Sequence, residues 1–420
     1  MPTIVLLGSL DTKGPEYGYL KSCVEEAGAV ALLVDWGVLG TPGCAPDIGA
    51  AEVAAAGGGD IAALRFSREG SDTRARALEV MRAGAEVILR RLHAEGRCDG
   101  VIGAAGSGGT SVIAAAMNAL PVGVPKVMVS TMAGTPQAGA AFGSRDLCVM
   151  NSITDIAGLN RVSRRILRNA AFAAVGMARS GAPPTEQDRP LVAITMFGVT
   201  TPGVLRVAER LQAAGFETIT FHAVGSGGRS MEEMIAGGLI DGVVDYTVSE
   251  LTDEYLGGVF TAGPDRLEAA SRAGIPQVVV PGAIEVLNFG PRATVPAKYD
   301  RPERRLIVHN TMVSAVRTTL EEGVALAAIL CDKVNRASGP VAVMLPLQGL
   351  DKYQQRPDGP WIDAAADAAF FAAVRARLRP DIPCRELPLN INDAAFADAT
   401  AAEFLRLWAE RRGPSRRTAA

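Results

Sequence analysis

A glycine-rich stretch in the first half of the chain has the composition of an anion-binding turn. Gly106-Ser107-Gly108-Gly109-Thr110 lies between an apolar run that predicts a buried strand and an alanine-rich run that predicts a helix. Glycines let main-chain N–H groups approach a phosphate closely, and Ser107 and Thr110 add hydroxyl donors beside the positive end of the helix. The stretch lacks the lysine of a Walker A loop and does not match G-x-G-x-x-G, so a tight turn needed only for packing stays an alternative.

Polar residues also follow two other predicted strands of the first half. Asp11, Thr12 and Lys13 place a carboxylate, a hydroxyl and an ammonium after the run 4–7, and Ser130 and Thr131 end the run 126–130. Open parallel sheets bind ligands at the carboxyl ends of their strands, so we expect these residues to help to hold a cofactor. The alternative is a solvated loop with an incidental ion pair. Arg74 and Arg76 near the start of a predicted helix 73–95 are usually solvated positions, from which one arginine could reach a phosphate.

The second half carries a similar set of residues that could contact a substrate. A second Gly-Ser-Gly-Gly turn follows a predicted strand 218–222, a hydroxyl-rich turn follows 191–197, and an acidic patch follows 243–246. We assign catalytic roles to His222, Arg229 and Glu250, because strand ends are favoured ligand positions. We assign substrate binding to Thr200, Thr201, Gly225, Gly227, Gly228 and His309. Alternatively, the histidines only hold their loops in place, and the acidic residues only face the solvent.

Neither a metal site nor a nucleophile can be assigned from spacing. The three histidines, His93, His222 and His309, show no H-x-x-x-H or H-E-x-x-H pattern, which argues against a metal site built from histidines. Magnesium held by carboxylates and phosphate stays open. No G-x-S-x-G motif occurs, so neither Ser107 nor Ser226 has the spacing of a nucleophile elbow.

The elements that must position these residues alternate between strands and helices. Apolar runs at 4–7, 30–34, 126–130 and 146–150 with helices at 14–27, 73–95 and 161–178 predict a first α/β lobe, 1–182. A polar, proline-bearing linker at 180–190 precedes a second lobe, 190–411, and a basic disordered tail, 412–420. Residues 47–59 are glycine-rich and predict irregular structure. We therefore expect an α/β fold of two Rossmann-like, doubly wound lobes with a cleft between them.

The composition limits the class of partner. Hydrophobic residues make up 48% and charged residues 21% of the 420, and 42 Lys and Arg oppose 45 Asp and Glu, for a net charge of -3. This balance gives no electrostatic reason to expect a nucleic acid or an anionic membrane. The six cysteines form no C-x-x-C pair, which favours reduced thiols. No apolar run of about 18 residues and no basic leader occur, so we expect a cytoplasmic protein.

Taken together, several stretches resemble the Tm-1-like ATP-binding family, the UPF0261-type proteins related to the N-terminal half of plant Tm-1. The resemblance covers almost the whole chain, from Ile4 to about Leu407, and departs at Asn390, where the family pattern begins with histidine, and at Glu285, where Asp is usual. It implies a two-lobed Rossmann-like chain that binds ATP with magnesium and forms a homodimer. The stretches that carry it are 10–13, 106–110, 125–131, 155–160, 196–202, 221–223, 227–232 and 309–310.

We expect an ATP-binding protein in which Asp11, Thr12, Lys13, residues 106–110, Ser130 and Thr131 hold the nucleotide. A small molecule in the cleft between the lobes would be the acceptor of an ATP-dependent phosphotransferase or ligase, with Lys13 and magnesium neutralising phosphate charge. The first alternative is a non-catalytic, nucleotide-dependent binding module. The second is a two-lobed protein that binds a sugar or another metabolite without a nucleotide.

Overall fold

The computed structural model describes residues 1–65, 71–135, 138, 142, 145–181, 189–355 and 359–411. The chain divides into two compact units, Met1–Thr185 and Glu186–Ala420, which are described separately below and are called unit 1 and unit 2. The tail expected at 412–420 lies outside the described residues, as does most of the expected linker. Within the described residues, no helix has both the length and the apolar character needed to cross a membrane.

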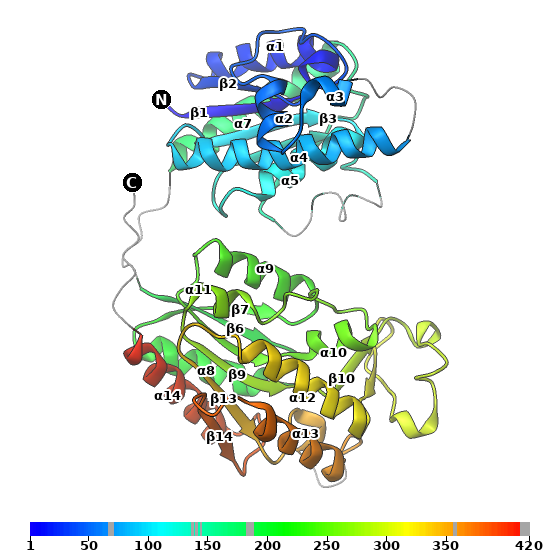
Figure 1. The fold of residues 1–420 in the computed structure, drawn as a ribbon, viewed down its shortest axis with the longest axis vertical. Helices are drawn as coiled ribbons and strands as arrows, with labels where there is room; N and C mark the ends of the chain where they lie inside the picture. Colours follow the sequence, from blue (N-terminus) through cyan, green and yellow to red (C-terminus); the bar gives the residue numbers. More distant parts are fainter. Residues whose placement is uncertain are drawn as a thin grey trace. The chain divides into compact units, whose positions relative to one another are not determined.

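Unit 1 is built on a five-stranded parallel sheet in the order β2-β1-β3-β4-β5 (Figure 1). The chain winds outward from β1 in both directions, so β1 and β3 are the neighbours between which the winding reverses. The elements of unit 1 are β1 (Thr3–Gly8), α1 (Leu10–Glu26), β2 (Val30–Asp35), α2 (Ala50–Ala56), α3 (Ile61–Arg65), α4 (Ser71–Ala94), β3 (Gly100–Ala105), α5 (Ser107–Asn118), β4 (Lys126–Ser130), β5 (Cys148–Asn151) and α7 (Arg161–Ser180).

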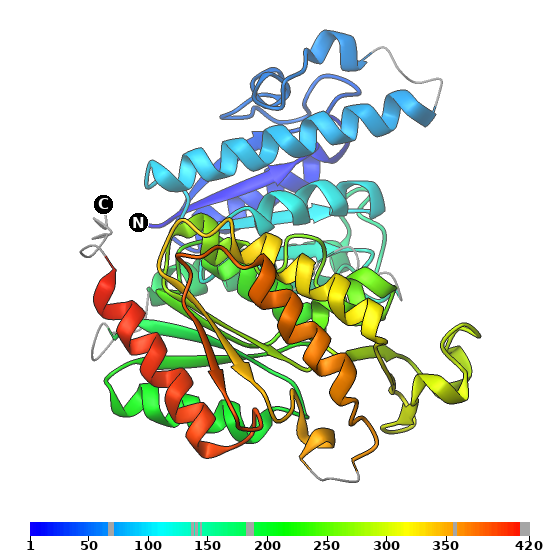
Figure 2. The same ribbon diagram turned by 60° about the horizontal axis from the view of Figure 1, so that its bottom comes forward.

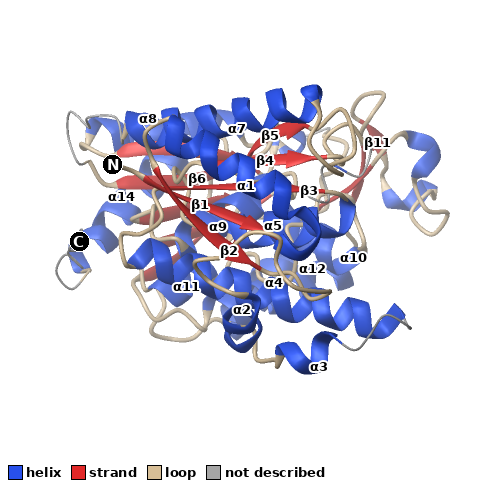
Figure 3. Cartoon of the chain, turned by 90° about the horizontal axis from the view of Figure 1, so that it is seen from above, coloured by secondary structure: helices blue, strands red, loops and turns tan. Residues whose placement is uncertain are grey.

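The period-two alternation of strand side chains builds one core on each face of this sheet. Ile4 and Leu6 pack into the core that includes side chains of α1 and α7, whereas Val5 and Leu7 pack into the core that includes α2, α4 and α5. Consecutive residues of a strand face opposite sides of the sheet, so an uninterrupted apolar strand requires helices on both faces. Figure 3, coloured by secondary structure, shows these helices flanking the strands of unit 1.

Unit 2 has the same winding with one more strand. Its six parallel strands run β14-β13-β9-β8-β6-β7, and its winding reverses between β6 and β8. Helices α8 and α14 contribute to the core on one face of the sheet, and α9 to α13 contribute to the cores on the other. In Figure 2, α12 (yellow) and α13 (orange) lie side by side.

The elements of unit 2 are β6 (Leu191–Met196), α8 (Thr201–Ala213), β7 (Glu217–His222), α9 (Ser226–Ala236), β8 (Gly242–Thr247), α10 (Ser249–Leu256), α11 (Ala269–Ala273), β9 (Gln277–Gly282), β10 (Val286–Phe289), β11 (Ile307–Val308), β12 (Ser314–Arg317), α12 (Leu320–Val334), β13 (Val341–Pro346), α13 (Ala364–Arg377), β14 (Cys384–Leu387) and α14 (Ala394–Glu410). Short 3-10 helices lie at Arg292–Thr294, Pro302–Arg304 and Lys352–Gln354. A small antiparallel sheet, β10-β12-β11, accompanies the main sheet and has no counterpart among the described residues of unit 1. The predicted fold class, two Rossmann-like doubly wound lobes, is therefore confirmed.

Two local predictions are wrong for identifiable reasons. Residues 47–59 are not entirely irregular, because α2 lies there. A glycine of this segment serves close helix packing: a Cβ on Gly57, at the end of α2, would lie 2.0 Å from the Val80 carbonyl oxygen in α4. Residues 10–14 are not a loop but the first turn of α1, which kinks at Lys13 (φ -125°, ψ 20°). Pro15 explains the kink, because its ring crowds the carbonyl four residues earlier.

Candidate functional site

A cavity of about 720 Å³ opens in unit 1 at the point where the winding reverses. It is lined by the turns that follow β1, β2 and β3, together with residues of α3 and α4. Sheets of the order 2-1-3-4-5 bind their ligands at the carboxyl ends of strands 1 and 3, and this volume is in the range of small-molecule sites. The fold and the cavity thus coincide at the position where a ligand is expected.

The N-terminus of α5 supplies free main-chain donors to this cavity. Gly106 is the N-cap of α5 without a side-chain cap, and the N–H of Thr110 donates to the Gly106 carbonyl at 2.9 Å. The preceding N–H groups, those of Ser107, Gly108 and Gly109, have no acceptor among the described residues, and all three residues line the cavity. Unpaired N–H groups at a helix N-terminus form an anion-binding site, strengthened by the helix dipole.

The two other glycines of this turn differ in the space around them. A Cβ on Gly108 would meet no atom closer than Arg74 Nη2, at 3.9 Å. A Cβ on Gly109 would lie 2.7 Å from the Ala105 Cβ and 3.1 Å from Trp36 Cζ2. Gly109 is therefore required by packing between α5 and its neighbours, whereas Gly108 borders open space.

The first turn of α1 brings the predicted residues Asp11, Thr12 and Lys13 to the same cavity. Asp11 Oδ2 accepts the Leu39 N–H at 2.6 Å, and its buried Oδ1 has no hydrogen-bond partner among the described residues. The Thr12 hydroxyl lies 2.9 Å from the Ser9 hydroxyl, and Lys13 Nζ donates to the Ile156 carbonyl. An ammonium has three donors, so Lys13 keeps two for a ligand.

Asp35, at the end of β2, holds two of the turns around the cavity in place. Its Oδ1 accepts the N–H of Leu10 at 2.9 Å and the N–H of Gly37 at 2.8 Å. Burial raises the pKa of this carboxyl above its ordinary value, and the two N–H groups partly oppose that shift. Trp36 follows directly, lines the cavity and buries an indole N–H that has no acceptor among the described residues.

Three cationic side chains line the cavity, against one carboxylate. Lys13, Arg65 and Arg74 give +3, and Asp11 gives -1, for a net +2. Among the described residues, Arg65 donates to the Gly40 carbonyl alone, at 3.4 Å, and Arg74 has no hydrogen bond or ion pair. The excess positive charge favours an anionic ligand.

Three residues predicted to hold the cofactor lie outside the cavity lining. Thr110 and Ser130 are fully buried, and their hydroxyls lie 2.7 Å apart. Ser130 Oγ also accepts the Met132 N–H at 3.0 Å, so the pair joins α5 to the end of β4. Thr131 is half-buried beside Gly106, where a Cβ would lie 3.9 Å from the threonine hydroxyl. These side chains therefore hold the turn at residues 106–110 in position and do not line the cavity.

The predicted residues of unit 2 are divided between the interior and the surface. Thr200 is fully buried, and its hydroxyl lies 2.8 Å from that of Thr247 across the β6 and β8 ends, while Thr201 donates to the Phe197 carbonyl at 3.2 Å. His222 is exposed, with its ring 5.6 Å from that of Phe197.

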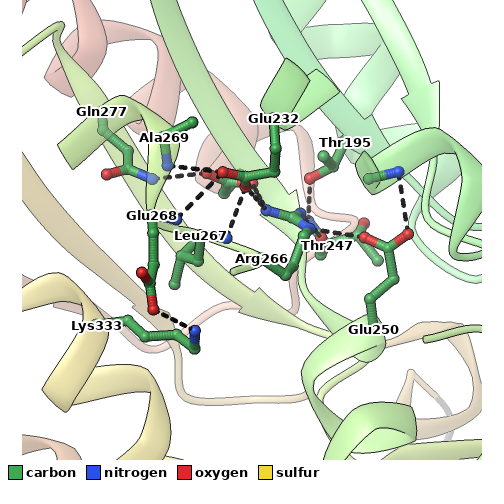
Figure 4. Close-up of polar contacts among 12 residues, drawn as sticks. Thr195, Glu232, Thr247, Glu250, Arg266, Leu267, Glu268, Ala269, Gln277 and Lys333 are labelled. Atoms are coloured by element: carbon green, nitrogen blue, oxygen red, sulfur yellow. Dashed lines mark hydrogen bonds and ion pairs between the residues drawn. The ribbon is translucent and has the colours of Figure 1, made fainter. Parts of the chain in front are cut away.

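Two further predicted residues of unit 2 lie at its surface. Exposed Arg229 donates to the Thr261 carbonyl at 2.7 Å. Exposed His309 lies 3.1 Å from the Tyr353 hydroxyl through Nδ1. Of the remaining predicted residues, Glu250 is fully buried next to Arg266 (Figure 4) and accepts the N–H groups of Gly225 and Gly228, whereas Gly227 is half-buried and packs against the His222 backbone.

The sequence analysis did not assign Asp35, Trp36 or Arg65 to the site. Asp35 directly follows the apolar run 30–34, and an acidic residue that closes a parallel strand next to a first βα turn is itself a signal. Trp36 directly follows β2, so the same strand-end argument applies to it, whereas Arg65 carries no such signal, because only the placement of α3 in the folded chain brings it to the cavity.

Unit 1 is thus an α/β domain with a cavity lined by more cationic than anionic side chains at the reversal point of its sheet, and unit 2 is a second domain of the same winding. The chain belongs to the UPF0261 family. Residues 2–183 match the model described as "Uncharacterised protein family (UPF0261) N-terminal domain", and residues 189–408 match the corresponding C-terminal domain.

The relatives span bacteria and plants. A UPF0261 protein of Clostridium tetani is 42% identical over 405 residues, which cover 96% of this chain and 98% of that protein. The ToMV resistance protein Tm-1(GCR237) of Solanum lycopersicum is 38% identical over 344 residues, or 80% of this chain and 45% of that protein. Among solved structures, the Streptomyces glycosyltransferase SsfS6 complexed with thymidine diphosphate aligns over 97% of this chain and 96% of its own, with 14% identity and a TM-score of 0.23.

Proposed function

We propose that unit 1 binds a nucleoside triphosphate, ATP, with its phosphates on the N-terminus of α5. The observation that carries the proposal is the run of three consecutive N–H groups, from Ser107 to Gly109, that have no acceptor among the described residues and border the cavity. Such amides bind phosphate oxygens without a side-chain clash, because Gly108 leaves space in front of them. The choice of ATP rests on the resemblance of the sequence to the Tm-1-like family.

The remaining lining suits the two ends of a nucleotide. Lys13, Arg65 and Arg74 supply positive charge for phosphates. Trp36, Val38, Leu39, Ala77 and Leu78 supply apolar surface for a base and a ribose.

Magnesium fits this cavity only as an ion carried by the nucleotide. No group of three or more metal-ligating side chains occurs among the described residues, and Asp11 is the one carboxylate of the lining. Mg²⁺ commonly takes one or two carboxylates together with substrate phosphates and water. Asp11 is therefore the residue that would hold the ion, which would neutralise phosphate charge.

We propose binding rather than phosphoryl transfer as the function of this site. Of the residues expected to receive an acceptor in unit 2, Thr200 and Glu250 are fully buried and bonded within the unit. His222, Arg229 and His309 are exposed but belong to separate contacts. Among the described residues, the cavity of unit 1 offers one carboxylate, that of Asp11, which is the group that would hold the ion, and no second carboxylate or histidine that could serve as a general base.

A calorimetric titration with matched arginine variants tests the proposal. Arg74→Ala should weaken ATP binding about 10- to 100-fold, because a hydrogen bond to a charged group is worth about 1.5–3 kcal/mol. Arg90→Ala on the same helix is the control, since Arg90 is exposed and lies 3.5 Å from Glu86. ADP should bind more weakly than ATP and AMP more weakly still. The absence of ATP binding to the wild type, or equal losses in the two variants, would contradict the proposal.

A further inference from the structure

The second Gly-Ser-Gly-Gly turn, at residues 225–228, already holds an anion. The N–H groups of Gly225 and Gly228 donate to Glu250 Oε1 at 2.7 Å and 3.1 Å. Glu250 belongs to the first turn of α10 and is fully buried. Its carboxylate therefore occupies the place on the α9 N-terminus that a phosphate or carboxylate ligand would take.

A buried guanidinium closes the other side of this carboxylate (Figure 4). Arg266 is fully buried, and its Nε donates to Glu250 Oε2 at 2.7 Å. The same guanidinium lies 2.7 Å from Asp245 and 3.2 Å from Glu232. Burial opposes its charge, yet the three carboxylates raise the pKa of Arg266 further above its ordinary value. Two amides and one permanent cation thus surround a single carboxylate.

The glycines of this turn are required by the close approach of that carboxylate and of the backbone. A Cβ on Gly228 would lie 2.2 Å from Glu250 Oε2, and a Cβ on Gly227 would lie 2.0 Å from the His222 carbonyl oxygen. Gly225 has a positive φ of 82°, a conformation that other residues rarely adopt. At Gly108 of unit 1, by contrast, the corresponding space is open.

We propose that residues 225–228 and Arg266 form an anion-binding site whose ligand is the chain's own Glu250. One consequence is that the chain binds one nucleotide and not two, since three of the four N–H groups of this turn are already bonded, those of Gly225 and Gly228 to Glu250 and that of Ser226 to the Val224 carbonyl. The other is that removing the Glu250 side chain opens a site for a small anion such as formate, acetate or inorganic phosphate. The second consequence does not depend on the function proposed for unit 1.

Thermal unfolding of the full-length Glu250→Ala variant in formate tests this site directly. The variant should melt below the wild type, and formate at constant ionic strength, balanced by chloride, should raise its midpoint in a saturable manner. When formate exceeds its dissociation constant tenfold, the expected rise is about 3–6 °C. The wild type should show no such rise. Glu250→Gln is the matched control, because its amide fills the site and leaves no room for formate.

Each outcome decides for or against the proposal. Saturable recovery confined to Glu250→Ala supports it. Equal recovery in Glu250→Gln, no recovery in either variant, or a Glu250→Ala variant as stable as the wild type would overturn it. If Glu250→Ala accumulates only as insoluble protein, refolding from urea with and without formate replaces the melt, and recovery in neither condition would overturn the proposal. ATP titration of the wild type separates the two hypotheses: two sites contradict this inference, whereas none contradicts only the function proposed for unit 1.

Discussion

Replacing Gly108 with leucine should abolish nucleotide binding while leaving the fold intact. The residue borders the cavity, and its Cβ would have no neighbour closer than Arg74 Nη2 at 3.9 Å, so the side chain has room to project over the amides of α5. Each phosphate hydrogen bond lost is worth about 1.5–3 kcal/mol, and every 1.4 kcal/mol is tenfold in affinity. Loss of two of the three amide contacts therefore weakens binding about 100-fold or more.

The stability of this variant should change little or rise. Glycine is about 1 kcal/mol less favourable than alanine in a helix, and leucine is close to alanine. Gly109→Ala is the contrasting variant, because its Cβ would lie 2.7 Å from that of Ala105. It should destabilise unit 1 by about 1–3 kcal/mol through overpacking. Calorimetric titration with ATP measures the affinity, and urea unfolding measures the stability. Wild-type affinity in a folded Gly108→Leu variant would refute the placement of the phosphates.

Substitutions at three further residues probe the groups that support the two units. Tyr17→Phe should cost about 1–3 kcal/mol in urea unfolding, because the buried hydroxyl donates to the Leu7 carbonyl at 2.6 Å and accepts the Ala104 N–H at 2.8 Å; an unchanged stability would contradict this. Asp35→Ala should reduce ATP affinity about tenfold, whereas Asp35→Asn, which keeps an acceptor for both turns, should retain most of it; equal losses would argue against a positioning role. Burial raises the pKa of Glu285 well above 4.5, so the native state keeps a proton that the unfolded chain releases, and stability falls as the pH rises above that value. The stability of Glu285→Gln relative to the wild type should therefore increase from about pH 5 to about pH 8 in urea unfolding, and a constant difference would refute it.

The alternation of strands and helices could be predicted because it depends on local pattern. The apolar runs at 4–7 and 126–130 lie in β1 and β4, and the glycines from Gly106 lie at a strand-to-helix turn. Two-sided burial makes such strands uniformly apolar, which is visible without tertiary information. The predicted helix 14–27 begins four residues later than α1, because the polar residues 11–13 before Gly14 and Pro15 have the composition of a loop, and here the helix continues through them with a kink at Lys13.

What could not be predicted depends on contacts between residues far apart in the chain. Arg65 and Arg74 reach the cavity because α3 and α4 lie near the sheet edge. In the sequence, both arginines precede the N–H groups of residues 107–109 by more than 30 residues. The sequence shows that Glu250 follows a strand, but not that its carboxylate meets Gly225 and Gly228, more than 20 residues away. The local sequence is the same whether such an acidic side chain faces the solvent or is buried as an internal ligand.

The two glycine turns differ in what they bind because they lie at different places in the same winding. The turn of unit 1 follows β3, the third strand, whereas that of unit 2 follows β7, which corresponds to β2. In unit 2 the strand that corresponds to β3 is β8, and it leads into the carboxylate of Glu250. Donors and acid therefore meet within unit 2 and satisfy each other. In unit 1 the acidic residue at the end of β2, Asp35, accepts the N–H groups of Leu10 and Gly37 instead. The first N–H groups of α5 therefore have no internal carboxylate as a partner.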